Sequence, residues 1–172
     1  AFIVYADYDL IDEKTNVLLY GRLENNQSFV SQHELEPYFF VKSSDAKKLS
    51  KYFKGDKFKI ENTELTNFQG DKVSKISANN HTELNKLHHV IHKSADTYEA
   101  DIKPNMRFII DNNLLGSLDI DGEYTSSERI DRVYNNPKIK PIDFEPKLKI
   151  ISVDIESSSS GELICIGIYT HN

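Results

Sequence analysis

Two carboxylates near the end of the chain have the types and spacing needed for metal chemistry. Asp154 and Glu156 flank Ile155 and follow a β-like run at residues 147–153. Side chains alternate between the faces of a strand, so both carboxylates share one face and Ile155 takes the other. A divalent cation between two such carboxylates removes their repulsion, and Mg²⁺ or Mn²⁺ suits hard oxygen ligands. In two-metal phosphodiester hydrolysis, one ion activates the attacking water and the other stabilises the leaving oxygen.

The residues after this pair predict a β-hairpin. Four serines and a glycine at residues 157–161 predict a turn, and residues 162–169 predict a second strand. The acids then lie at the C-terminal end of the hairpin's first strand. An acidic pair can also merely solubilise a strand end, but the hairpin favours metal binding, since RNase H-like exonuclease folds begin in this way.

The elements before the pair predict an α+β chain. An antiparallel β region at residues 2–31 is followed by a β-α-β-β-α-β order, typical of a ferredoxin-like or RRM-like unit, at residues 37–101. Ser44 and Asp45 are expected to cap the first helix of this unit and Gly55 to end it. The predicted elements of the unit are strand 38–41, helix 46–53, strand 57–61, strand 73–78, helix 81–91 and strand 97–100.

A short helix at 105–113 and an acidic strand at 117–124 are expected after the unit, with a polar turn at 125–127. Pro137, Pro141 and Pro146 then predict an extended linker or edge segment. We place the domain boundary there, giving an N-terminal domain at 1–146 and a second, truncated domain at 147–172.

Composition narrows the class of protein. The 172 residues are 38% hydrophobic, enough for one domain and part of another, and no apolar stretch is long enough for a membrane helix. The start lacks the layout of a secretory signal, and a single cysteine excludes an internal disulfide. We therefore expect a cytoplasmic protein with no membrane partner.

The charge is uneven along the chain. The net charge of −6 disfavours a free-standing nucleic-acid binder, yet residues 42–93 hold 11 lysines against 6 acids. This basic stretch could line a template path, or it could be a solvated surface. The lysines in question are Lys42, Lys47, Lys48, Lys51, Lys54, Lys57 and Lys59.

Three other candidates have a structural interpretation beside the functional one. His88 and His92 are four residues apart on a predicted helix, with His89 between them, a spacing that could hold one metal, although ordinary histidines are commoner. Cys165 is expected to be a small core residue and not a nucleophile. Arg107 is expected to form a surface ion pair, with DNA contact as the alternative.

Two blocks of sequence resemble family B DNA polymerases. Residues 153–156 (Val-Asp-Ile-Glu), followed by 161–167 (Gly-Glu-Leu-Ile-Cys-Ile-Gly), are similar to the first exonuclease motif of that family, most of all in the bacterial DNA polymerase II group. Residues 98–104 (Tyr-Glu-Ala-Asp-Ile-Lys-Pro), followed by Arg107 and Phe108, resemble the segment that leads toward the exonuclease domain, also in archaeal relatives. The first 96 residues resemble the family only in the order of their elements.

The resemblance implies a DNA polymerase with a 3′–5′ proofreading exonuclease, whose metal ions (Mg²⁺ or Mn²⁺) are bound in part by Asp154 and Glu156. Its partners would be primer-template DNA, a single-stranded 3′ end and deoxynucleotides, near the nucleoid, with a sliding clamp possible through regions outside this chain. Only 16 residues follow Glu156, so we expect the parent gene to continue and this piece alone to be inactive.

Two alternatives stay open. The chain could be a fragment of a DnaQ-like exonuclease, which also begins at an Asp-x-Glu pair. It could instead be an RRM-like module that binds single-stranded nucleic acid. The aromatic strand at 38–40 lacks the glycine-and-aromatic signature of a true RNA-recognition motif, so we take the fold from that pattern and not the activity.

Overall fold

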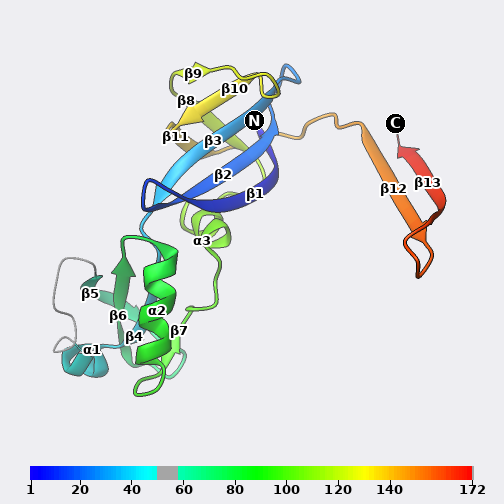
Figure 1. Cartoon of the computed structure of the whole chain (residues 1–172). Coiled ribbons are helices and arrows are strands. Elements are labelled where there is room, and N and C mark those ends of the chain that lie inside the picture. The colour runs from blue at the N-terminus through cyan, green and yellow to red at the C-terminus, as the bar shows by residue number, and fades with distance from the viewer. Residues whose placement is uncertain (50–57, 172) are drawn as a thin grey trace.

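The structure, a computed structural model, describes residues 1–49 and 58–171, with the side chain of residue 171 left out. Figure 1 shows three parts along the chain: a lobe built on a five-stranded sheet, a lobe built on a four-stranded sheet, and a hairpin at the C-terminal end. The predicted α+β class is confirmed, since the sheets are mostly antiparallel and the helices are few.

The first lobe begins with three antiparallel strands. Asp12 and Glu13 both have positive φ angles, 49° and 63°, as a two-residue hairpin loop requires to match the right-handed twist of its strands. The sheet order is β1-β2-β3-β10-β9. Its strands are β1 (Phe2–Ile11), β2 (Lys14–Arg22), β3 (Ser28–Leu35), β9 (Tyr124–Thr125) and β10 (Arg132–Asn135).

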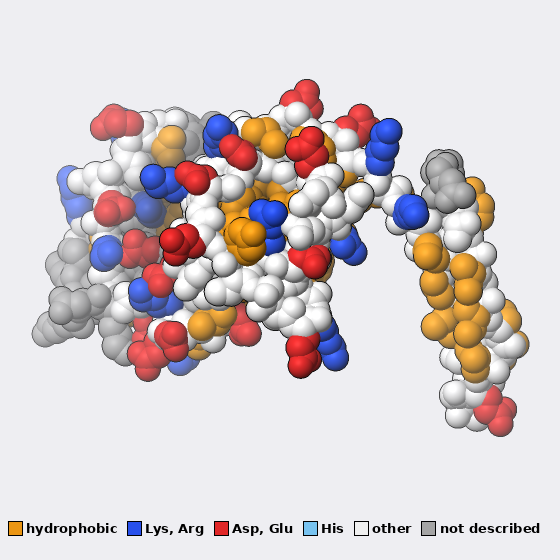
Figure 2. Space-filling model, turned by 90° about the horizontal axis from the view of Figure 1, so that it is seen from above, with side chains coloured by type: hydrophobic (Ala, Val, Ile, Leu, Met, Phe, Trp, Pro, Cys, Tyr) orange, Lys and Arg blue, Asp and Glu red, His pale blue; other side chains and the backbone are white. Residues whose placement is uncertain are grey.

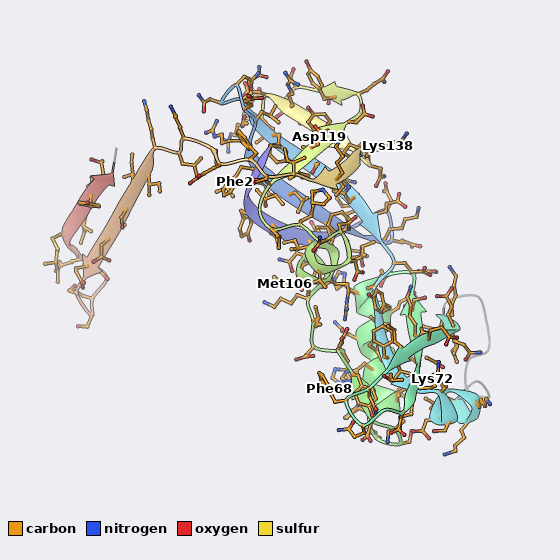
Figure 3. The ribbon with its side chains drawn as sticks, turned by 180° about the vertical axis from the view of Figure 1, so that it is seen from behind. Phe2, Phe68, Lys72, Met106, Asp119 and Lys138 are labelled. Carbon is orange, nitrogen blue, oxygen red and sulfur yellow. The ribbon has the colours of Figure 1, made fainter. Side chains whose placement is uncertain are left out.

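Two features of the first lobe differ from the sequence prediction. Strand β10, at residues where the sequence predicted no strand, pairs in parallel with β3 in register Val133 with Val30, although the N-terminal domain was expected to be antiparallel. The acidic strand expected at 117–124 is divided into β8 (Leu118–Asp121) and β9, which takes up Thr125 from the expected turn. The proline-bearing stretch also contains β11 (Lys138–Pro141), which pairs with β8 as an edge strand. Proline has no N–H group to donate, and an edge strand tolerates it because no further strand has to be paired there. Figure 3 labels Asp119 and Lys138 on this two-stranded sheet.

Helix α3 (Pro104–Asp111) contributes Phe108 to the core of the first lobe. It begins at a proline, which has no amide hydrogen to leave unpaired in the first turn. Its Phe108 is 7% exposed and packs among the inward-facing side chains of the sheet. The buried hydrophobic cluster consists of Val17, Leu19, Phe29, Phe108, Leu114, Leu118 and Tyr134.

The second lobe has the expected β-α-β-β-α-β order. Its sheet order, β5-β6-β4-β7, is antiparallel throughout, and the helices pack on one face. The expected helix positions Tyr52 and Phe53, with Gly55, lie outside the described residues. The elements are β4 (Tyr38–Lys42), α1 (Ser43–Leu49), β5 (Phe58–Thr66), β6 (Lys72–Ala78), α2 (His81–Ile91) and β7 (Thr97–Tyr98).

Two expected element ends in this lobe were placed differently. Helix α1 begins at Ser43, so Ser44 and Asp45 lie inside its first turn and not at its cap. The last strand ends at Tyr98, because Glu99 has a φ of 58° and turns the chain toward α3.

Asn80 joins the two lobes. Its side-chain oxygen accepts from the amide of Glu83 at 2.9 Å, which caps α2, and its side-chain nitrogen donates to the carbonyl of Glu13 at 2.9 Å. Beside it, the amide of His81 donates to the Thr15 hydroxyl at 2.7 Å. The start of α2 is therefore bonded to the β1–β2 turn of the first lobe.

The hairpin extends away from both lobes. It consists of β12 (Ile150–Ser157) and β13 (Leu163–His171), reached through an extended segment after β11 (Figure 1). That segment is anchored near its start, where the Ser117 hydroxyl donates to the carbonyl of Phe144. Figure 2 shows hydrophobic side chains gathered along one side of the hairpin. Within the described ranges, no helix has the length and apolar character to span a membrane.

Candidate active site on the terminal hairpin

The turn of the hairpin is closed by its serines. The amide of Ser158 donates to the carbonyl of Glu162 at 2.9 Å, and the amide of Gly161 donates to the carbonyl of Ser158 at 2.9 Å. Gly161 has a φ of 83°, a conformation that glycine adopts without steric cost. The hydroxyl of Ser158 also accepts from the amide of Glu162 at 3.1 Å. This run of serines therefore forms a bonded turn, as predicted.

The register of the hairpin puts Asp154 and Glu156 on the same face. Asp154 lies opposite Gly167, and Glu156 lies opposite Cys165. Residues alternate between faces along a strand, so these four positions and the pair Ser152–Tyr169 share one side, the carboxylate face. The two carboxylates thus lie two residues apart on the same strand. The residue across from Asp154 is Gly167, which has no side chain.

The other side of the hairpin is called the aliphatic face. All the side chains around its centre are branched and apolar. Val153 lies opposite Ile168 and Ile155 opposite Ile166. Their exposed fractions are 51–69%, far above the values expected for isoleucine and valine in a finished sheet. An exposed strip of this kind marks a surface that another layer covers. The side chains concerned are Ile151, Val153, Ile155, Ile164, Ile166 and Ile168.

The carboxylate face fits a partial site for a hard cation. Asp154 and Glu156 supply oxygen ligands, and a Cβ atom at Gly167 would lie 3.9 Å from the Cβ of Asp154, so the glycine leaves room beside that side chain. Among the described residues no group of three or more His, Cys, Asp or Glu side chains could hold a metal ion. Of the described residues, this face therefore brings together two carboxylates that could bind a cation, and not a complete ligand set.

Cys165 was expected in a core, and that prediction was wrong for this chain. Its side chain is exposed on the carboxylate face, opposite Glu156. The strand around it is apolar, which is the signal that suggested burial. No layer covers these apolar neighbours among the described residues. The apolar pattern therefore predicted the strand correctly, but it did not predict that Cys165 is exposed.

Arg107 was expected at the surface, and it is buried. Its side chain is 5% exposed and donates to the carboxylate of Glu99 at 2.7 Å, while its guanidinium lies 4.4 Å from the centre of the Tyr38 ring. Tyr38 donates in turn to the carboxylate of Asp111 at 2.9 Å, and burial and this hydrogen bond raise the pKa of Tyr38 to about 12. The residues of the second sequence block, 98–108, therefore make the packed junction between β4, β7 and α3.

The three histidines lie together at the C-terminal end of α2. Ring centroids are 5.4 Å apart for His88 and His92 and 6.0 Å apart for His89 with each of the others. His88 bonds to the Thr97 hydroxyl at 3.1 Å, and His92 to the carbonyl of His88 at 3.0 Å. Burial lowers the pKa of His88, and the neighbouring histidines lower it further. These local bonds fit structural histidines.

The lysines proposed for a template path are engaged where they are described. Lys42 pairs with Asp71 at 2.9 Å, Lys48 with Asp45 at 2.9 Å, and Lys59 with Glu36 at 2.8 Å. Lys51, Lys54 and Lys57 lie outside the described residues. Ion pairs this open to solvent are weak and leave the lysines accessible, so the pairing does not decide between a template path and a solvated surface.

On the sheet face where RNA-recognition folds bind bases, the side chains are buried or already paired with one another. In the second lobe this is the face away from the helices, with Tyr38, Phe40 and Lys42 on β4 and Lys75 on β6. Phe40 is 8% exposed, and Lys75 lies 3.6 Å from Glu61 and over the Tyr38 ring. This arrangement disfavours the binding-module interpretation.

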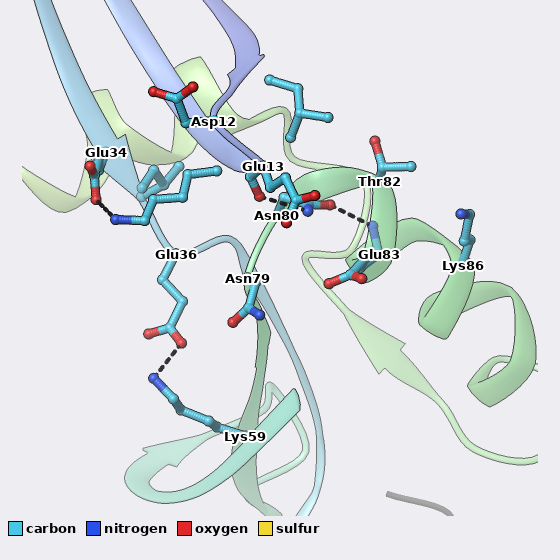
Figure 4. A pocket seen from close by; sticks show the side chains of 13 residues that line it. Asp12, Glu13, Glu34, Glu36, Lys59, Asn79, Asn80, Thr82, Glu83 and Lys86 are labelled. Carbon is cyan, nitrogen blue, oxygen red and sulfur yellow. Dashed lines mark hydrogen bonds and ion pairs between the residues drawn. The ribbon is translucent and has the colours of Figure 1, made fainter. Parts of the chain in front are cut away.

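A polar groove lies between the two lobes, and the sequence did not predict it. It has a volume of about 900 Å³ and is lined by five acids and three lysines. One of these lysines, Lys59, pairs with Glu36 at 2.8 Å (Figure 4). Its walls come from the β1–β2 turn, the end of β3, β5 and the start of α2. These segments are far apart in sequence, so local patterns carry no signal for it.

Comparisons with known proteins point in one direction. No family model matches the chain. DNA polymerase II of Escherichia coli (strain K12) is 24% identical over 170 residues, which is 97% of this chain and 21% of that protein. The chain thus spans about a fifth of the length of this curated relative.

The comparison of folds, like the comparison of sequences, finds a DNA polymerase. The structure of the family B DNA polymerase from the hyperthermophilic archaeon Pyrobaculum calidifontis matches with a TM-score of 0.68 and 19% identity, over 99% of this chain and 26% of that one. The resemblance drawn from the two sequence blocks is confirmed by these two matches together.

Proposed function

We infer that this chain is the N-terminal part of a family B DNA polymerase, and from that premise we propose that its terminal hairpin begins the 3′–5′ proofreading exonuclease. The observation that carries the proposal is the two-sided hairpin. One face presents Asp154 and Glu156 side by side, and the other presents a strip of isoleucine and valine. A first hairpin of an enzyme sheet needs both: a face for chemistry and a face for the layer that covers it.

The division of labour follows from this arrangement. Residues 1–146 form the N-terminal domain, whose two lobes are joined through Asn80 and Arg107. Residues 147–172 belong to an RNase H-like exonuclease domain, of which they are the first hairpin. In the parent enzyme, primed template DNA and deoxynucleotides are the substrates of synthesis, and a single-stranded 3′ end is the substrate of proofreading.

The chemistry assigned to the hairpin is metal-dependent phosphodiester hydrolysis. Asp154 and Glu156 would hold Mg²⁺ or Mn²⁺ through their oxygens. Bound metal supplies an activated water and neutralises the charge on the leaving oxygen. The rigid strand pairing keeps the two carboxylates on one face, and the closed serine turn fixes the end of the strand that bears them. We place the parent protein in the cytoplasm, at the nucleoid, with a sliding clamp as a further partner bound outside residues 1–172.

The test is a pair of substitutions in the parent polymerase. Asp154→Ala and Glu156→Ala should each lower the rate of 3′–5′ degradation of single-stranded DNA by roughly a hundredfold or more, because each removes a metal ligand. Template-directed synthesis should continue in both variants. Glu162→Ala is the matched control, since it removes a carboxylate from the turn of the same hairpin. Full exonuclease activity in the Asp154→Ala and Glu156→Ala proteins would contradict the proposal.

The 172-residue chain by itself should be inactive in both reactions, because it supplies two carboxylates and no further metal ligands beside them among its described residues. The measurement is incubation of the purified chain with end-labelled single-stranded DNA and Mn²⁺. Degradation that disappears in Asp154→Ala would show that two carboxylates suffice and would refute this part of the proposal.

A further inference from the structure

Within the part of the chain that the structure describes, nothing requires Gly167 to be a glycine. Other glycines of the chain have such reasons: a Cβ at Gly21 would lie 1.9 Å from the carbonyl oxygen of Phe2, and Gly161 has a φ of 83°. Gly167 has neither, since its φ is not in the left-handed region and its added Cβ would make an ordinary 3.9 Å contact with Asp154. Alanine therefore fits the hairpin at this position.

Glycine in the interior of a strand weakens the strand, because its backbone loses more freedom on folding and it has no side chain to pack. A glycine within a strand often marks a bulge, a tight bend, or a place where a ligand or another backbone approaches closely. The register shift of this hairpin lies between Glu156 and Ser157, beyond the pair of Asp154 with Gly167, so a bulge does not account for the glycine and close approach is the remaining reason. At Gly167 that place lies beside Asp154 on the carboxylate face.

We propose that Gly167 is a positioning residue of the exonuclease: its bare backbone keeps the space beside Asp154 open for the terminal nucleotide of a single-stranded 3′ end. The inference rests on the proposed function of Asp154 and Glu156. It adds a residue that touches neither metal nor water and acts by leaving room for the substrate strand.

The charge on this face favours a nucleotide over a packed protein segment. A protein layer laid on Asp154 and Glu156 would bury two carboxylates, and buried carboxylates without a cation or donor are strongly unfavourable. A nucleotide would bring no such penalty, because a cation held by Asp154 and Glu156 would offset the charge of the carboxylates and of its phosphate. The aliphatic face is the one suited to a covering protein layer, because its exposed side chains are isoleucine and valine.

The test uses a graded series in the parent polymerase, Gly167→Ala and Gly167→Val. We expect Gly167→Val to lower the exonuclease rate on single-stranded oligo(dT) by about tenfold or more, with Gly167→Ala between it and the natural protein, because displacement of a reacting group by an ångström has effects of this size. The second readout is the Mn²⁺-dependent binding of a fluorescent oligo(dT) with a nuclease-resistant phosphorothioate 3′ end, followed by anisotropy. Its affinity should fall in the same order. Polymerase activity on primed DNA should not change.

Thr170→Val is the matched control. Thr170 lies on the same strand but on the aliphatic side, opposite Ile151. Its exonuclease rate and oligonucleotide affinity should match those of the natural enzyme.

The outcomes separate this inference from the proposed function. If Asp154→Ala loses exonuclease activity while Gly167→Val keeps both rate and oligonucleotide affinity, the role of Gly167 is overturned and the site stands. If Asp154→Ala keeps activity, the site itself is wrong. A fall in thermal stability with Gly167→Ala also overturns the inference, because it means that a protein segment fills the space; stability that is unchanged or raised supports it.

Discussion

The imidazole of His33 packs against the ring of Phe108, with the ring centroids 4.7 Å apart, at the point where β3 meets α3. His33 is 5% exposed, and one of its ring nitrogens bonds to the Ser31 hydroxyl at 3.0 Å. Burial lowers the pKa of His33 from 6.5 to about 4. A histidine held neutral in this way makes the stability of the first lobe depend on pH.

The stability of the chain should fall as the pH drops from about 6.5 to about 4. In that window the unfolded chain binds a proton at His33 and the folded chain does not, so the free energy of unfolding decreases with falling pH. The loss should reach about 3 kcal/mol below pH 4, and it should be absent above pH 7. Urea denaturation at several pH values measures it. Burial also lowers the pKa values of His81 and His88, so His33→Gln is the comparison that isolates one residue. A natural protein and variant with parallel pH profiles would rule out the assignment.

Asn80→Ala should destabilise the chain by about 1–2 kcal/mol, because it removes the cap of α2 and the bond to the β1–β2 turn together. The neighbouring Asn79 is exposed and lines the same groove, so Asn79→Ala is the control and should change stability little. Chemical denaturation provides the measurement. Equal effects of the two substitutions would mean that the lobes are not joined through Asn80.

Local patterns were enough to predict most of the elements. The helical spacing of Leu84 and Ile91 predicted α2, and both are buried on its inner face. The β-like run before Asp154 and the serine turn predicted the hairpin and the shared face of the two carboxylates. These features are decided within a few residues, which is the range over which periodicity and turn chemistry act.

Features that depend on distant residues were missed. Strand β10 is only four residues long and pairs with β3, so that Arg132 lies beside Phe29 across a separation of about a hundred residues. The burial of Arg107 depends on Tyr38, which a different lobe supplies. Long-range pairings of this kind leave no periodic signal in the segments that make them.

Arg107→Met should destabilise the chain by about 2 kcal/mol. It leaves Glu99 without its guanidinium partner and removes the cation from the Tyr38 ring. Glu99 is about half exposed and regains water, which keeps the loss below that of a fully buried pair. Lys103→Met is the control, because Lys103 precedes the same helix and its side chain makes no capping bond. Thermal unfolding should show a lower midpoint for Arg107→Met alone, and an unshifted midpoint would contradict the buried role of the pair.

A chain that ends at residue 146 should fold as stably as the 172-residue chain. The two hydrophobic clusters lie entirely within residues 1–146, whereas the hairpin residues from 150 to 170 are almost all exposed. Removal of the hairpin should leave the midpoint of cooperative unfolding unchanged.

Removal of the hairpin should also abolish most of the fluorescence of a dye such as ANS, which reports exposed apolar surface, because the aliphatic face is removed with it. The substitution of Ile155 and Ile166 by threonine in the longer chain should lower dye fluorescence in the same direction, with the strand pairing intact. A shortened chain that unfolds at a markedly lower temperature would place the domain boundary elsewhere, since the hairpin would then contribute to the core of the first domain.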